Sequence, residues 1–126
     1  MVKRYVDGFV LVVPKKNLKV YNKMASDGGK IWMKYGALQY VECVGEDLKN
    51  AAKWGCLPFP KMTNAKPTEN VVFSFIIYKS KAHRDKVNAK VMKDPTMNQE
   101  KYKDMPFEMK RMAVGGFETI VHLGGK

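Results

Sequence analysis

The chain has 126 residues, of which 45% are hydrophobic and 11% aromatic, a composition that suits one folded domain and excludes a disordered chain. No apolar run approaches the roughly 18 residues that a membrane-spanning helix needs, so no membrane partner is predicted. The net charge of +11 arises from 23 basic and 12 acidic side chains spread along the whole chain. Because nearly all of the basic residues are lysine, whereas nucleic-acid recognition favours arginine, a specific nucleic-acid interface is the less favoured reading and weak non-specific binding the more favoured.

The expected cellular compartment and the expected cofactors are inferred from a few residue types. The N-terminal residues lack the long apolar region and cleavage site of a signal peptide, which predicts a cytoplasmic protein. Cys43 and Cys56 are then expected to be free thiols, and Cys43, in the middle of a predicted strand, to be a small buried hydrophobic residue. Two histidines and two cysteines without ligand spacing predict no metal, and no phosphate-binding glycine loop is present, so no cofactor is expected.

The first predicted elements are a strand and a helix. Residues 5–13 are rich in valine and phenylalanine and predict a strand. Pro14 suits the first position of a helix, because the missing amide hydrogen is not needed there. Apolar residues then recur at three- and four-residue steps as far as Tyr35, which predicts an amphipathic helix closed by Gly36. Gly28-Gly29 inside this helix indicates a kink or the close approach of another segment.

A second strand is predicted at 37–44, and a long irregular excursion follows at about 46–70. This excursion contains Trp54, Leu57 and Phe59, which are too apolar for a purely solvated loop. We therefore expect Pro58-Phe59-Pro60 to fold back over the domain or onto a partner subunit. The 47–54 part is expected to stay mobile.

The most informative stretch runs from Val71 to Met92. Its first eight residues are β-branched or aromatic and predict a buried strand. Ser80 is a good N-cap for the helix that follows, which places His83 and Arg84 in the first helical turn at the end of a central strand. Asp94-Pro95 is expected to stop this helix.

The remaining elements complete a recognisable order. A short helical piece around 98–103, a strap at 105–107 and a last strand at 112–122 follow. The order β-α-β-β-α-β is the ferredoxin-like plan, an α+β fold in which helices cover one face of a four-stranded antiparallel sheet, here spanning 1–126 as one domain. Every strand is apolar on both faces, so the sheet face without helices should be buried too, which predicts a homodimer.

Seven segments carry a family resemblance. They are Tyr5-Val6-Asp7-Gly8-Phe9-Val10, Tyr40-Val41-Glu42-Cys43, Val72-Phe73-Ser74-Phe75, Tyr78-Lys79-Ser80-Lys81-Ala82-His83-Arg84-Asp85, Val87-Asn88-Ala89-Lys90-Val91-Met92, Met105-Pro106-Phe107 and Gly115-Gly116-Phe117-Glu118. Together they resemble the YbaA-like bacterial proteins, a family of unknown function in the dimeric α/β-barrel superfamily.

The resemblance implies a ferredoxin-like homodimer whose two sheets close a barrel. It implies no established reaction and no assigned catalytic residues. The wider superfamily includes cofactor-free quinone-forming monooxygenases, haem-degrading enzymes and muconolactone isomerases, but transfer from them is an analogy at the level of the fold.

Acidic residues in the strands are the first chemical candidates. Asp7, Glu42 and Glu118 each interrupt an apolar strand, and a buried carboxylate is costly unless it is bonded or paired. The first and last strands are neighbours in this fold, so Asp7 and Glu118 could approach each other and form a general acid or base. The favoured alternative is that each acid bonds to a lysine, an arginine or a backbone amide at the dimer seam or barrel rim.

His83 is the third catalytic candidate, because its imidazole titrates near neutral pH. The alternative is that His83 packs near Val87 while Arg84 pairs with a nearby acid. The candidate ligand-binding residues are Arg84, Trp32, Tyr40 and Asn88.

Two function classes remain. The first is a bacterial homodimeric protein that binds a small aromatic or anionic molecule, with metal-free oxygenase- or isomerase-like turnover as an extension. The second is a non-catalytic binding or structural dimer that contacts RNA weakly through its basic surface. A closed apolar cavity of roughly 300 Å³ or more that contains His83 or a strand acid would favour the first, whereas a filled core and a continuous lysine-rich stripe would favour the second.

Overall fold

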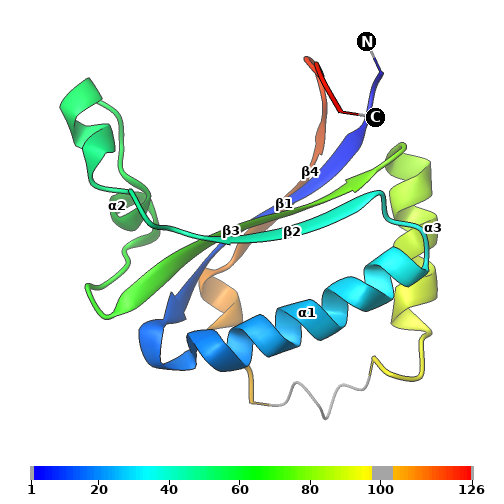
Figure 1. The fold of residues 1–126 in the computed structure, drawn as a ribbon, viewed down its shortest axis with the longest axis horizontal. Coiled ribbons are helices and arrows are strands. Elements are labelled where there is room, and N and C mark those ends of the chain that lie inside the picture. The colour runs from blue at the N-terminus through cyan, green and yellow to red at the C-terminus, as the bar shows by residue number, and fades with distance from the viewer. Residues whose placement is uncertain (1, 98–103, 126) are drawn as a thin grey trace.

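The sheet and its two long helices form one layered unit in the computed structural model, which describes residues 2–97 and 104–125. The four antiparallel strands lie in the order β2-β3-β1-β4 and are β1 (Tyr5–Pro14), β2 (Gln39–Val44), β3 (Glu69–Tyr78) and β4 (Ala113–Glu118). Helices α1 (Leu18–Lys34) and α3 (Lys81–Met92) lie on one face, which we call the inner face (Figure 1). The predicted ferredoxin-like α+β fold is confirmed, and the sheet of one chain is not closed into a barrel.

Alternation along the central strands builds the core. Leu11 of β1 pairs with Val72 of β3, and both side chains are buried on the inner face. Tyr21 and Ala25 of α1 pack against them. A second cluster at the other end of the sheet joins Ile76 and Tyr78 of β3 to Val87 and Val91 of α3.

Both ends of α1 are set by local chemistry. Pro14 is the last residue of β1, with extended backbone, and a short 3₁₀ helix (Lys15–Asn17) separates it from α1. The expectation that Pro14 is the first helical residue is therefore wrong. Gly36 closes the helix with a φ of 110°, as predicted, because glycine adopts this left-handed region without a steric penalty.

Helix α3 begins where the sequence places it. The Ser80 side chain accepts a hydrogen bond from the backbone amide of His83, so Ser80 is confirmed as the N-cap. Beyond the end of the helix, the buried Asp94 accepts hydrogen bonds from the Tyr35 hydroxyl at 2.6 Å and from Lys34 Nζ at 3.2 Å. These contacts fix the far end of α3 to the end of α1.

The excursion between β2 and β3 is more ordered than predicted. It contains a 3₁₀ helix (Asn50–Trp54) and α2 (Phe59–Thr63), and it extends past the end of the sheet on the side opposite α1 (Figure 1). Helix α2 lies near β3, whereas the Trp54 side chain is 83% exposed. The predicted mobility of residues 47–54 stays a prediction.

The C-terminal segment lies against the inner face of the sheet at Phe107 and then joins the sheet as the edge strand β4. Phe107 is buried and meets the Tyr21 ring edge-on, with 5.7 Å between the ring centroids. Strand β4 ends at Glu118, earlier than predicted. The predicted helical piece at 98–103 lies outside the described residues.

The outer sheet face, opposite α1 and α3, is apolar and largely uncovered. Phe73 of β3 is 45% exposed and Phe117 of β4 is 62% exposed. Val12 and Val71 are buried on this face, near the base of the excursion. Cys43 is exposed here, so the expectation of a buried thiol is wrong for the single chain.

Candidate functional site

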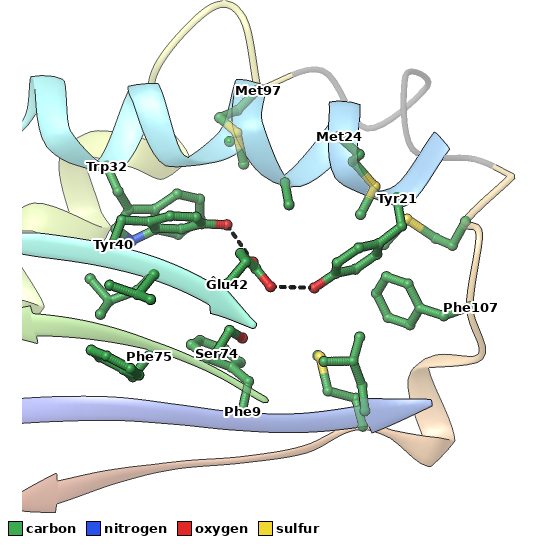
Figure 2. Close-up of a pocket in the computed structure, with 17 residues that line it drawn as sticks. Phe9, Tyr21, Met24, Trp32, Tyr40, Glu42, Ser74, Phe75, Met97 and Phe107 are labelled. Carbon is green, nitrogen blue, oxygen red and sulfur yellow. Dashed lines mark hydrogen bonds between the residues drawn. The ribbon is translucent and has the colours of Figure 1, made fainter. Parts of the chain in front are cut away.

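A cavity of about 250 Å³ lies between α1 and the inner face of the sheet (Figure 2). Aromatic rings and methionine side chains form most of its wall. The lining residues are Phe9, Leu11, Tyr21, Met24, Ala25, Gly28, Trp32, Tyr40, Val41, Glu42, Ser74, Phe75, Ile76, Met97, Met105, Phe107 and Met112. Among the residues that the structure describes, Glu42 is the one charged side chain in this wall.

The strand register brings Glu42 to the cavity. Glu42 of β2 pairs with Ser74 of β3, and Tyr40 pairs with Ile76, so these four side chains share the inner face. Because side chains alternate along a strand, Tyr40 and Glu42 point to the same side. A polar position in an otherwise apolar sheet thus faces α1 rather than solvent.

Two tyrosine hydroxyls hold the Glu42 carboxylate. The Tyr21 hydroxyl donates to Oε1 at 2.7 Å and the Tyr40 hydroxyl donates to Oε2 at 2.9 Å (Figure 2). Burial, reinforced by the hydrogen bond to Glu42, raises the pKa of Tyr21 far above its usual value, so this phenol stays a neutral donor. Within the described part of the chain, no lysine, arginine or histidine forms an ion pair with Glu42.

The glycine pair in α1 makes room for Tyr40. A Cβ atom on Gly29 would lie 2.6 Å from the Tyr40 ring, whereas one on Gly28 would come no closer than 3.9 Å to Trp32. The predicted close approach is therefore confirmed. Trp32 lies beside Tyr40, with 6.4 Å between ring centroids, and its indole nitrogen donates to Asn88 Oδ1 at 3.0 Å.

An open groove of about 590 Å³ lies on the other side of the same residues, between α1 and β2. Tyr21, Ala25, Tyr40 and Glu42 line both the groove and the cavity. The carboxylate and its two tyrosines therefore stand between the apolar cavity and the more polar groove.

Asp7 and Arg84 form a separate polar cluster. Arg84 Nη1 donates to Asp7 Oδ1 at 2.6 Å, Arg84 Nε donates to Asp85 Oδ1 at 2.8 Å, and the guanidinium lies 4.9 Å from the centre of the Tyr5 ring. Burial raises the pKa of Asp7 although Arg84 opposes the shift. Arg84 therefore pairs with acidic side chains of the protein itself, which is the alternative predicted from the sequence.

His83 does not reach the cavity. Its Nδ1 accepts a hydrogen bond from the Lys79 backbone amide at 2.9 Å, and its ring meets Tyr78 edge-on. Burial, together with the nearby charge of Lys79, lowers the pKa of His83 and favours the neutral imidazole. Its position next to Gly36 connects the start of α3 to the end of α1.

The two remaining strand acids do not pair with each other. Strands β1 and β4 are neighbours, as expected, but Asp7 lies opposite Gly116 and Glu118 lies opposite Tyr5. The Glu118 side chain is exposed, and Arg84 is the partner of Asp7. The structure therefore brings together Trp32, Tyr40 and Asn88, but leaves His83, Asp7 and Glu118 outside this site.

The sequence pattern suggests a pairing of Asp7 with Glu118, but it assigns no partner to Glu42 and no role to Tyr21. One signal was available, since Glu42 and Tyr40 are two positions apart in a strand and must share a face. Tyr21 comes from a helix, so its contact with Glu42 depends on packing that no local pattern gives.

Among the described residues, no group of three or more histidine, cysteine or acidic side chains could hold a metal ion. The helices in the described part of the chain are too short or too polar to cross a membrane.

Comparison with known proteins agrees with the resemblance noted in the sequence. The model of the family described as "Protein of unknown function (DUF1428)" matches residues 4–109. "Uncharacterized protein YbaA" from Escherichia coli (strain K12) is 42% identical over 118 residues, which cover 94% of this chain and 97% of the relative. YbaA from Shigella flexneri gives the same values.

A solved structure shares the fold. It is a dimeric ferredoxin-like protein from an uncultured marine organism, with a TM-score of 0.57 and 10% sequence identity. The match covers 99% of this chain and 100% of that chain.

Proposed function

Because the chain belongs to the DUF1428 family, whose function is unknown, we propose a function from the cavity itself: the protein binds a small aromatic molecule beneath α1. The supporting observation is an apolar, ring-lined cavity whose described lining contains one carboxylate, that of Glu42. Ligand sites of this kind combine a mainly apolar lining with a few polar groups that fix the orientation of the ligand.

The size of the cavity suits one substituted ring system. A dry cavity of about 150 Å³ takes up benzene, so about 250 Å³ is enough for a bicyclic or substituted aromatic molecule. It is somewhat below the roughly 300 Å³ set above as favouring a ligand site. Glu42 is the strand acid that lies in it.

The charge of the site selects between the expected ligands. An anionic molecule would approach the Glu42 carboxylate without a cation to receive it, so the aromatic alternative is the better supported one. Metal-free turnover stays a prediction, and Glu42 is the proton acceptor that the cavity offers in place of the expected Asp7 or Glu118. The cavity supports a binding role by its apolar lining and its strand acid, although its volume is below the criterion given for that class.

We also propose that two copies pair through their outer sheet faces. Phe73 and Phe117 are exposed there on neighbouring parts of one apolar surface, and burying such surface is the main driving force of association. A second copy supplies the same surface across a two-fold axis. Closure of the two sheets into a barrel is part of this proposal.

Neutral indole tests the ligand site. We expect indole to shift amide resonances of residues around the cavity in an NMR titration, and Ala25→Met to abolish these shifts because the larger side chain fills the cavity. Val20→Met is the matched control, since Val20 lies on the exposed side of the same helix. Binding that survives Ala25→Met, or no binding by the wild-type protein, would contradict the proposal.

Light scattering tests the dimer. We expect about twice the chain mass of 14.4 kDa for the wild-type protein and a lower mass for Phe73→Lys. Val20→Lys, which adds the same charge on the exposed side of α1, should keep the larger mass. A folded wild-type monomer would refute this part of the proposal.

A further inference from the structure

Among the described residues, the one charged side chain that lines the cavity is acidic, whereas the chain as a whole is basic. The chain carries 23 basic and 12 acidic side chains, yet the described cavity lining contains no lysine, arginine or histidine and one acid, Glu42. A random sample of this chain's charged groups would favour a basic lining. The lining therefore differs from the surface in sign, which bears on the charge of the ligand.

The partners of Glu42 leave its negative charge uncompensated. In the described part of the chain, the groups that donate to Glu42 are the neutral hydroxyls of Tyr21 and Tyr40. A carboxylate has about four acceptor sites on its two oxygens, so two hydrogen bonds leave capacity on each oxygen. Glu42 is half-buried and has no cationic partner among the described residues, so an opposite charge on a ligand would add charge-assisted hydrogen bonds at this carboxylate. A cationic ligand supplies that charge.

The aromatic wall suits a cation as well. Rings attract a positive group placed over their faces within about 6 Å, and tryptophan does so most strongly. Trp32 and Tyr40 lie side by side next to the carboxylate (Figure 2). Phe9 and Phe107 complete an apolar wall for the remainder of the ligand.

From these observations we infer that the cavity takes a small organic amine, with its ammonium group against Glu42 and its apolar part among the rings and methionines. This inference rests on the proposed function, and it narrows the ligand to a charge class. An ammonium ion donates to the spare acceptor sites of the carboxylate, and hydrogen bonds to charged groups are stronger than neutral ones. A neutral alcohol makes one weaker bond, and a carboxylate ligand is repelled.

Three probes of similar shape and different charge test the inference near neutral pH. They are 2-phenylethylamine, 2-phenylethanol and 3-phenylpropionate, each titrated into the full chain and followed by NMR. We expect the amine to bind about tenfold more tightly than the alcohol, and the alcohol more tightly than the carboxylate. If the alcohol binds as tightly as the amine, the charge preference is wrong while the ligand site stands. If none of the three binds, the inference and the proposed function fall together.

The Glu42→Gln variant tests whether the preference for the amine depends on the Glu42 carboxylate. This substitution keeps the shape and removes the charge, so we expect the amine to lose its advantage of about tenfold while the alcohol binds as before. Glu46→Gln is the control, because Glu46 is an exposed acid outside the cavity lining. An unchanged amine preference in Glu42→Gln would overturn the inference. The comparison of probes on the wild-type protein decides the ligand class even where the variant folds poorly.

Discussion

Asp7 and Glu42 are two carboxylates on the same face of one sheet, but their surroundings differ. Asp7 of β1 is 6% exposed and bonds to the Arg84 guanidinium at 2.6 Å. Glu42 of β2 bonds to the neutral hydroxyls of Tyr21 and Tyr40 and faces a cavity. Arg84 of the same chain neutralises the charge of Asp7. The charge and the spare acceptor sites of Glu42 are available to a ligand.

This difference separates a carboxylate that stabilises the fold from a carboxylate that can bind a ligand. Both interrupt apolar strands, so sequence context does not distinguish them, although Asp7 is buried and Glu42 is half-buried. The counter-ion distinguishes them, because Arg84 already neutralises the charge of Asp7 and also pairs with Asp85. No cation pairs with Glu42 among the described residues. A carboxylate held by neutral donors beside an empty volume is the better candidate for ligand recognition.

The largest expected effect comes from breaking the structural pair. Arg84→Met leaves Asp7 buried without its cation, and removal of one partner of a buried pair costs about 3–5 kcal/mol. Urea denaturation should show this loss in the free energy of unfolding. Asp85→Asn, which removes the more exposed partner of the same arginine, should change it by less than about 1 kcal/mol. A small effect of Arg84→Met would remove the distinction drawn between Asp7 and Glu42.

An intermediate effect is expected at the support of the binding acid. Gly29→Ala places a methyl group within 2.6 Å of the Tyr40 ring, so the ring must move and the variant should lose about 1–3 kcal/mol. Gly28→Ala meets no atom closer than 3.9 Å and should be neutral or stabilising by up to about 1 kcal/mol, because alanine favours the helix. Thermal unfolding of the two variants checks the contrast. Equal losses would show that Tyr40 is not held in place by Gly29.

Glu42→Gln should cost less stability than Arg84→Met. The glutamine oxygen can still accept one tyrosine hydroxyl, so we expect a loss of about 1 kcal/mol, the net value of one hydrogen bond. Urea denaturation of the two variants under one condition makes the comparison direct. A loss as large as that of Arg84→Met would mean that Glu42 is itself mainly structural.

Local pattern predicted the elements of the fold, because strands and helices follow from alternation, helical spacing and caps. Ser80 capped its helix as expected, and the neighbouring positions of β1 and β4 followed from the order of elements. The pairing of Asp7 with Arg84, 77 positions apart, depends on how α3 packs on the sheet. No pattern of residue spacing in the sequence predicts this pairing.

The same limit applies to the cavity. Tyr40 and Glu42 share a face by strand alternation, which the sequence contains. The second donor, Tyr21, belongs to α1, and the hollow exists because side chains from the strands and from α1 leave a space between them. Such a space depends on side-chain volumes across several elements, so it becomes visible only in three dimensions.

A third acid, Glu69, extends the comparison, and removing its partner is expected to give the smallest change in stability. Arg111 donates to its two carboxylate oxygens at 2.7 and 3.1 Å and, with help from the Lys66 amide, lowers the pKa of Glu69 from 4.5 to about 2. Because the folded-state pKa lies below the unfolded value, the pair stabilises the fold above about pH 4.5. This contribution disappears as the pH falls towards about 2.

Arg111→Met should therefore lower the midpoint of thermal unfolding near neutral pH and converge with the wild-type protein in acid. Lys110→Met is the control, since Lys110 and its partner Glu108 are exposed and 3.9 Å apart, and it should show almost no difference at either pH. Taking the difference between variant and wild type removes the effect of the other titrating acids. A gap that stays constant from neutral to acid pH would mean that Arg111 acts through packing and not through the charge of Glu69, and a counter-ion would then no longer identify a structural carboxylate in this protein.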